Sequence, residues 1–157
     1  MVLGENAYKV LESGSLLKAA LWCSRVRRGV PGAGGAVRAL PGVDPNRIGL
    51  MGHSRGSVAA LTVAASGADV QAVAAADGTP AVSYVPQTQG SLLVIEGLSD
   101  TTFSPQTVMS YVAALQAAGK TVRTDYVPGA PHTLVWEAPW QSAADSAMSA
   151  FFRGALG

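Results

Sequence analysis

The segment Arg47-Ile48-Gly49-Leu50-Met51-Gly52-His53-Ser54-Arg55-Gly56 decides the fold. Its apolar first half predicts a short buried strand, and the small residues at 57–65 predict a helix. A G-x-S-x-G pattern at a strand-to-helix turn places its serine on a sharp, strained bend with Oγ exposed above the sheet. Glycines two residues before and after Ser54 keep Cβ atoms away from the adjoining strand and helix. Ser54 is therefore the candidate nucleophile of such an elbow.

Beyond this segment the chain alternates between strand and helix patterns. Apolar runs predict strands at 47–52, 70–76, 92–96 and 121–127. Apolar residues at helical spacing predict helices at 54–66, between Ser104 and Gly119, and at 138–152. Residues 79–90 are expected to form an irregular loop. This alternation is typical of a doubly wound, mostly parallel α/β sheet, and the 157 residues are expected to form one domain, 1–157.

The first 40 residues carry weaker signals. Leu17, Ala20 and Leu21 recur at helical spacing and predict a helix at 15–24. Residues 25–35 have no periodicity and predict a loop. The segment 1–40 is therefore assigned to the same domain without a defined place in its sheet.

The composition argues against several classes of function. Lys and Arg number 11 against 10 Asp and Glu, and a net charge of +1 predicts neither nucleic-acid binding nor attraction to an anionic membrane. A single cysteine excludes an internal disulfide, and with only two histidines beside it no metal or cofactor is expected. The chain shows no signal-peptide pattern and no apolar run of membrane-spanning length, so a cytoplasmic protein is expected.

A serine hydroxyl becomes a good nucleophile only when a base takes its proton and a third group orients that base. His132 lies in the turn 128–133 after the last predicted strand, and it is the candidate base. His53 is the alternative base. As the variable residue of the elbow, however, its side chain is expected to point away from Ser54 Oγ.

Asp100 is the candidate acid because it lies just past the strand 92–96, at the edge where catalytic groups of open α/β sheets gather. Asp77 also ends a predicted strand and is the rival acid. Ser54, Asp100 and His132 follow one another in the serine–acid–histidine order of α/β-hydrolases.

Residues 39–157 resemble the α/β-hydrolase superfamily, and most closely its branch of dienelactone-hydrolase-like esterases and prolyl-oligopeptidase catalytic domains. Three motifs in the same order carry the resemblance: LPGVDPNRIGLMGHSRGS at the elbow, LLVIEGLSDTTFSPQ at the acid and ALQAAGKTVRTDYVPGAPHTL at the histidine. The resemblance implies that Ser54 is the nucleophile, Asp100 the orienting acid and His132 the base.

The N-terminal part departs from the family pattern. The family's sheet carries four strands before the elbow strand, whereas 53 residues precede Ser54, so a shortened N-terminal part and a reduced sheet are expected. The backbone N–H of Arg55 is expected to be one oxyanion donor. The glycine-rich segment 32–35 is a candidate for the second donor, with a plain loop as the alternative.

These features predict a serine hydrolase that cleaves small carboxylic esters through an acyl-serine intermediate. The short 79–90 loop and the lack of a lid-sized insertion favour small, accessible esters over long-chain lipids. Phe103, Tyr84 and Trp136 lie near the predicted catalytic loops and are candidate walls of the substrate site, with core or rim packing as the alternative. A serine peptidase of the same fold and a non-catalytic binding or assembly module are the other functions considered.

With too few N-terminal residues for a complete sheet, the strand nearest the missing part would present unpaired N–H and C=O groups, and such an edge invites pairing with another chain. A homodimer or larger homo-oligomer is therefore expected. If residues 1–40 fold back over this edge instead, the chain is expected to be a monomer.

Overall fold

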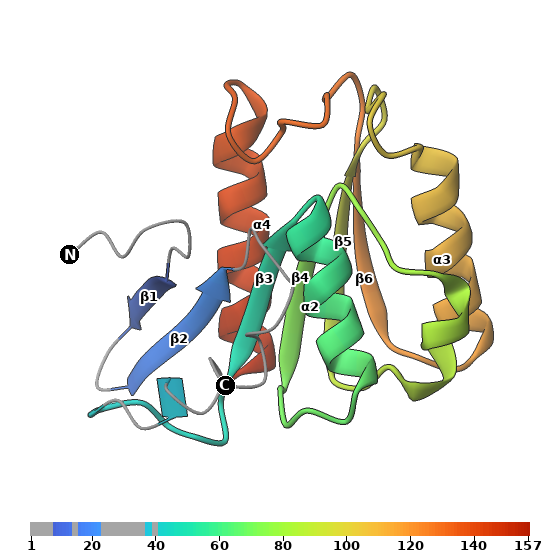
Figure 1. The fold of residues 1–157 in the computed structure, drawn as a ribbon. Helices are drawn as coiled ribbons and strands as arrows, with labels where there is room; N and C mark the ends of the chain where they lie inside the picture. The colour runs from blue at the N-terminus through green and yellow to red at the C-terminus, as the bar shows by residue number, and fades with distance from the viewer. Residues whose placement is uncertain (1–7, 14–15, 23–36, 39–40) are drawn as a thin grey trace.

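A computed structural model of the chain describes residues 8–13, 16–22, 37–38 and 41–157 (Figure 1). The strands in these ranges form one six-stranded sheet in the order β1-β2-β3-β4-β5-β6. β1 runs antiparallel to β2, and all other neighbouring strands pair in parallel. Their bounds are Tyr8–Ser13, Leu16–Trp22, Gly49–His53, Ala72–Ala76, Ser91–Gly97 and Val122–Val127, from β1 to β6. The predicted mostly parallel α/β sheet is confirmed.

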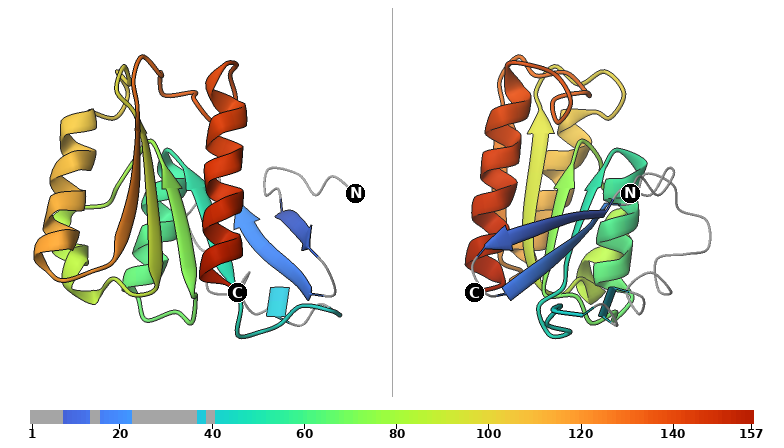
Figure 2. Two further views of the ribbon diagram at one scale, coloured as in Figure 1. Left: turned by 180° about the vertical axis from the view of Figure 1, so that it is seen from behind. Right: turned by 90° about the vertical axis from the view of Figure 1, so that its left-hand side faces the viewer.

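Helices cover both faces of this sheet. α2 (Arg55–Ala65) and α3 (Pro105–Ala117) pack on one face, and α4 (Trp140–Ala155) packs on the other (Figures 1 and 2). The helices predicted after residue 53 are therefore confirmed, with ends that differ by a few residues. No helix in the described ranges combines the length and the apolar character needed to cross a membrane.

The expectation of an irregular loop at 79–90 is wrong for part of its length. Val82–Gln87 forms a 3-10 helix, η1, although Pro86 lies within it. The cause is burial, because Val85 is only 4% exposed and belongs to the same apolar cluster as Leu61 of α2 and Tyr111 of α3. The segment 82–87 therefore crosses the apolar surface formed by α2 and α3, and Val85 packs into that surface.

The helix predicted at 15–24 is wrong. Residues Leu16–Trp22 form β2, which pairs in parallel with β3 and places Ala20 opposite Gly49. A short apolar run suits a buried strand as well as a helix, and the pairing partner decides between them. β3 consequently has a neighbour, and β1 is the outermost strand on that side of the described sheet. Self-association itself stays a prediction, and the loop expected at 25–35 lies outside the described residues.

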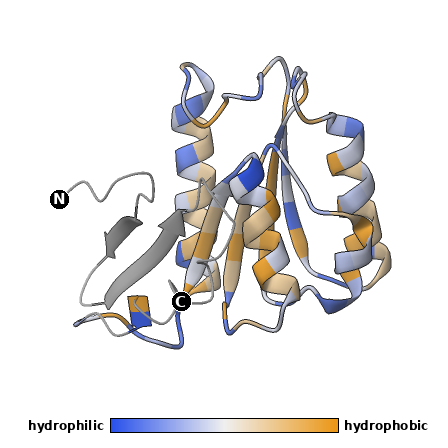
Figure 3. Ribbon diagram, in the orientation of Figure 1, coloured by the Kyte–Doolittle hydropathy of each residue, from blue (hydrophilic) through white to orange (hydrophobic). Residues whose placement is uncertain are grey.

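Apolar clusters form the core on both faces of the sheet, two large ones and a smaller one of Val94, Val108 and Val112 beneath α3. Alternate residues of β4 divide between the two large clusters: Val73 and Ala75 join the cluster under α2, whereas Ala72, Ala74 and Ala76 join the cluster under α4. This division follows from the two-residue period of a strand. Because both faces are covered, β4 is apolar along its whole length, as its colour shows in Figure 3.

The parallel strands bring the predicted catalytic residues to one edge of the sheet. The carboxyl ends of β3 to β6 all point the same way, towards the top of Figure 1. Ser54 and Asp77 directly follow β3 and β4, whereas Asp100 and His132 lie in the loops after β5 and β6. The fold therefore gathers four polar groups from four separate segments.

The packing of α4 on β3 gives a test of this fold. A Cβ at Gly49 would lie 2.7 Å from Phe152 Cε1 and 3.3 Å from Leu156 Cδ1. Gly49→Ala should therefore lower the free energy of unfolding by about 1–3 kcal/mol through overpacking. Gly154→Ala, a control in α4 with open space around its Cβ, should raise it by up to about 1 kcal/mol. Urea unfolding measures both changes, and equal stability of the two variants would contradict this packing.

Candidate active site

Ser54 occupies a bend that ordinary residues avoid. Its φ is 57° and its ψ is −122°, between the end of β3 and the first residue of α2. Its N–H donates to Ala76 O at 2.8 Å, and its own carbonyl accepts from the amides of Ser57 and Val58 at 3.0 and 3.2 Å. The neighbouring strand and the first turn of α2 thus fix the bend, and the predicted strand–turn–helix elbow is present.

The bend needs close approaches that only glycine permits. A Cβ on Gly52 would collide with the backbone of Gly56, as the motif implied. A Cβ on Gly78 would lie 2.8 Å from Ser54 O. The hydroxyl of the fully buried Ser57 also donates to the carbonyl of Gly78. The contribution of Gly78 was missed in the sequence because its contact partner lies in another loop.

His132 forms hydrogen bonds to both of its predicted partners. Its Nε2 lies 2.9 Å from Ser54 Oγ, and its Nδ1 lies 2.7 Å from Asp100 Oδ2. A carboxylate only accepts hydrogen bonds, so Nδ1 carries the proton and Nε2 can accept one from the serine hydroxyl. The structure therefore brings Ser54, His132 and Asp100 together, and Asp100 rather than Asp77 is the acid bound to His132.

The Asp100 carboxylate is fully buried and well supplied with donors. Its Oδ1 accepts from the backbone amides of Thr102 and Phe103 at 2.6 and 2.9 Å. Together with the bond from His132, these contacts stabilise a buried anion that would otherwise be costly. The acid loop and the histidine loop are also joined directly, because Ser99 N donates to Ala130 O at 2.9 Å.

Arg55 supplies an unpaired donor beside Ser54. It is the first residue of α2, and the N–H of such a residue has no acceptor one helical turn earlier. A helix N-terminus also favours negative charge. This amide can therefore face an oxyanion formed next to Ser54 Oγ. The segment 32–35, the candidate for a second donor, lies outside the described residues.

Two of the three predicted wall residues lie beside the histidines. The Phe103 ring stacks near the His132 imidazole, with centroids 6.3 Å apart and planes inclined by 12°. Trp136 is 45% exposed and meets His53 edge-on at 5.8 Å.

Tyr84 lies in a different segment from these groups, and its role as a wall stays a prediction. It lies in η1, after which Gln89 N donates to Ala64 O near the far end of α2. Pro86, also in η1, accepts from Lys120 Nζ beyond the end of α3. Since α2 begins at Arg55 and rises about 1.5 Å per residue, Ala64 lies well over 10 Å from the elbow.

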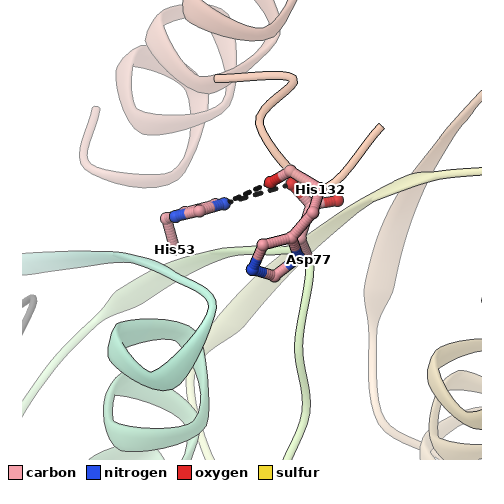
Figure 4. A group of neighbouring side chains, drawn as sticks. All are labelled: His53, Asp77 and His132. Atoms are coloured by element: carbon pink, nitrogen blue, oxygen red, sulfur yellow. Dashed lines mark hydrogen bonds and ion pairs between the residues drawn. The ribbon is translucent and has the colours of Figure 1, made fainter. Parts of the chain in front are cut away.

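A second histidine–aspartate pair, not foreseen as a pair, adjoins the first (Figure 4). His53 Nε2 lies 2.6 Å from the carbonyl oxygen of His132 and 3.4 Å from Asp77 Oδ2. Asp77 Oδ1 accepts from Gly97 N at 3.0 Å. His53, the alternative base, and Asp77, the alternative acid, thus contact each other, and His53 also contacts the main chain of His132.

The whole sequence can now be compared with known proteins. Residues 15–153 match the dienelactone hydrolase family. The chain belongs to the dienelactone hydrolase family. No curated protein matches the sequence.

Three solved structures illustrate the breadth of similar folds. A dipeptidyl peptidase 4 from Porphyromonas gingivalis is 21% identical with a TM-score of 0.73, over 80% of this chain and 22% of its own. A dienelactone hydrolase-like promiscuous phosphotriesterase from metagenomic libraries is 20% identical with a TM-score of 0.72, over 80% and 59%. Acetyl xylan esterase 1 from a Thermoanaerobacterium species is 19% identical with a TM-score of 0.64, over 80% and 50%. The chain thus has the α/β-hydrolase fold and spans less than two thirds of each of these proteins.

Among the described residues of this dienelactone hydrolase family member, two groups of side chains could offer ligand atoms to a metal ion. They are His53, Asp77 and His132, and Asp77, Glu96 and Asp100; within each group the ligand atoms lie within 4.8 Å of one another. In the first group every imidazole nitrogen already has a hydrogen-bond partner. In the second, both oxygens of Asp100 accept hydrogen bonds. Metal binding at either group would therefore compete with the contacts that orient His132.

Glu96 is a buried acid at the end of an otherwise apolar run in β5, and the sequence pattern did not single it out as a functional candidate. It is fully buried at the end of β5, and neither side-chain oxygen has a hydrogen-bond partner among the described residues. Burial, with smaller contributions from the charges of Asp77 and Asp100, raises the pKa of Glu96 from 4.5 to about 8. Glu96 consequently carries a proton at neutral pH.

Glu96 should make stability depend on pH. Between its unfolded pKa of 4.5 and its folded pKa of about 8, the native state keeps a proton that the unfolded chain has released. The free energy of unfolding should therefore fall as pH rises through this window, by about 1 kcal/mol per pH unit. Glu96→Gln should remove this contribution, whereas Glu137→Gln, at an exposed site, should not. Urea unfolding at pH 5.5 and 7.5 measures the slopes; equal slopes for both variants would refute the assignment.

Proposed function

We propose that the chain is a serine hydrolase that cleaves small carboxylic esters through an acyl-serine intermediate. The observation that carries the proposal is the pair of hydrogen bonds joining Ser54 Oγ, His132 and Asp100, at 2.9 and 2.7 Å. Membership of the dienelactone hydrolase family supports the same chemistry.

In the first half of the reaction, Ser54 Oγ attacks the ester carbonyl carbon while His132 Nε2 takes the hydroxyl proton. The Asp100 carboxylate stabilises the imidazolium that forms. The carbonyl oxygen becomes an oxyanion, which the Arg55 N–H can stabilise. The C–O bond to the alcohol then breaks as His132 returns its proton to the leaving oxygen, giving an alcohol and an acyl-serine.

In the second half, a water molecule takes the place of the alcohol. His132 Nε2 removes a proton from the water as its oxygen attacks the acyl carbon. Collapse of this second oxyanion breaks the bond to Ser54 Oγ, and His132 returns the proton to the serine. The products are a carboxylic acid and the original enzyme.

The surroundings of His132 favour small substrates. Its side chain is 19% exposed, with the Phe103 ring 6.3 Å away and the His53 ring 4.9 Å away, and Trp136 meets His53 edge-on. These rings leave limited space beside Ser54, which favours a compact acyl group. An ester is also the easier substrate, because its carbonyl is less stabilised by resonance than that of an amide, and an amide nitrogen must be protonated before it can leave. The similar structures include an esterase and a peptidase, so peptide cleavage is tested beside ester cleavage.

Ser54→Ala should abolish hydrolysis of p-nitrophenyl acetate and covalent labelling by a fluorophosphonate, because both reactions form a bond to Oγ. Ser54 is a half-buried turn residue whose hydroxyl contacts His132, so the thermal transition should shift little. The control is Ser110→Ala, which removes the hydroxyl of an exposed serine on α3 and should leave both reactions unchanged.

Retained hydrolysis in the purified Ser54→Ala protein would refute the acyl-serine mechanism. Cleavage of peptidyl p-nitroanilides in preference to esters would indicate a peptidase, and no labelling of the folded wild type would indicate a non-catalytic module.

Asp100→Asn should lower kcat by about four orders of magnitude, the cost of the same change in serine proteases, because the amide can present a donor to Nδ1 and stabilise the wrong tautomer of His132. Steady-state ester kinetics measure the loss. Asp145→Asn, on α4, is the matched control and should leave kcat within about twofold. An Asp100→Asn enzyme with near-normal kcat would remove Asp100 from the mechanism.

A further inference from the structure

His53 makes three polar contacts that leave neither ring nitrogen free. Its Nδ1 lies 3.4 Å from Trp136 Nε1. Its Nε2 lies 2.6 Å from His132 O and 3.4 Å from Asp77 Oδ2, and both of these lines start at the same nitrogen in Figure 4. The hydrogen bond thus reaches the main chain of His132, and the two imidazole rings lie 4.9 Å apart.

These partners determine which nitrogen of His53 carries the proton. The indole N–H of Trp136 can only donate, so Nδ1 must accept. A carbonyl and a carboxylate can only accept, so Nε2 must donate to His132 O with Asp77 Oδ2 beside the same proton. Asp77 is fully buried, and its negative charge strengthens this donor.

The carbonyl of His132 depends on this contact. Within residues 41–157 no backbone N–H donates to it, whereas the preceding Ala130 O accepts from Ser99 N at 2.9 Å. Ala130, near the start of the loop after β6, is therefore bound to Ser99 in the loop after β5. His132, two residues further along the same loop, is bound through its carbonyl to His53 at the end of β3. Rotation of the His132 peptide would break the second attachment and move the imidazole relative to Ser54 Oγ.

We infer that His53, oriented by Asp77, is a positioning residue that holds the His132 main chain so that Nε2 stays within hydrogen-bond distance of Ser54 Oγ. The inference rests on the proposed function for its effect on rate. His53 itself touches none of the reacting atoms. Loss of its hydrogen bond should therefore lower kcat and leave KM nearly unchanged, because displacements of about 1 Å can cost about 100-fold in rate.

Two substitutions at His53 separate the hydrogen bond from the bulk of the ring. His53→Phe keeps an aromatic ring but has no donor, whereas the Nε2 of glutamine in His53→Gln can donate to His132 O. With p-nitrophenyl acetate, His53→Phe should lose about 10- to 100-fold in kcat. His53→Gln should stay within about threefold of the wild type, with KM similar in both. A kcat within twofold of wild type in His53→Phe, or equal losses in both variants, would overturn the inference.

Asp77→Asn tests the same contact without altering the histidine. The amide oxygen can still accept from Gly97 N, but the amide NH₂ then faces the proton on His53 Nε2. A similar loss of kcat is expected, against no loss in Asp145→Asn. An unchanged kcat in folded Asp77→Asn would overturn the role given to Asp77, even if His53→Phe were too unstable to measure.

A spectroscopic readout keeps this inference separate from the proposed function. The proton between His132 Nδ1 and Asp100 should give a low-field proton NMR resonance in the wild type and in His53→Gln. It should shift or broaden in His53→Phe and Asp77→Asn. If the wild type cleaves no ester but these spectra behave as described, the proposed function fails and the positioning role stands. An identical resonance in all four proteins would overturn the positioning role.

Discussion

The left-handed backbone of Ser54 is the constraint on which the rest of the site depends. With φ at 57°, a non-glycine residue there costs about 1–3 kcal/mol, and the cost must be met by its surroundings. The bond from Ser54 N to Ala76 O and the first turn of α2 maintain the bend, while Gly52 and Gly78 clear the space it needs. Asp77 repeats the left-handed conformation at the end of the adjacent strand, with φ at 53°. Ser54 and Asp77 thus leave the sheet through two strained turns at the ends of adjacent strands.

Hydrogen-bond donors decide what each of the three buried acids at this edge can do. Asp100 accepts two backbone N–H bonds and one imidazole bond, and these contacts let it orient His132. Asp77 accepts one backbone bond and lies beside His53. Glu96 accepts none, and burial therefore leaves it protonated at neutral pH. A site with three carboxyl groups within 4.8 Å of one another avoids three adjacent charges in this way.

The sequence predicts those parts of the molecule whose signals are local. The elbow around Ser54 and the strands and helices after residue 53 depend on period and turn chemistry that a short window contains. β2 was missed because its apolar run suits helix or strand until β3 is placed beside it. The pairing of His53 with Asp77 was missed for a similar reason, since both residues had been judged only as rivals for roles near Ser54. Contacts between segments distant in sequence, such as Gly78 with Ser54, carry no signal in a single chain.

The inferred role of His53 is to hold His132 in place, not to replace it as the base, and the order of strands in the sheet explains why such a contact is needed. β3 and β6 are separated by β4 and β5, so the elbow and the histidine loop have no backbone pairing to fix their distance. The His53 side chain spans this gap by bonding to His132 O, with the two rings 4.9 Å apart. The variable position of the elbow motif thus connects the strand that leads to Ser54, the proposed nucleophile, with the loop that carries His132, the proposed base. A residue there without a donor would leave the nucleophile turn intact and loosen its relation to the base, which is why the effect is expected in kcat rather than in folding.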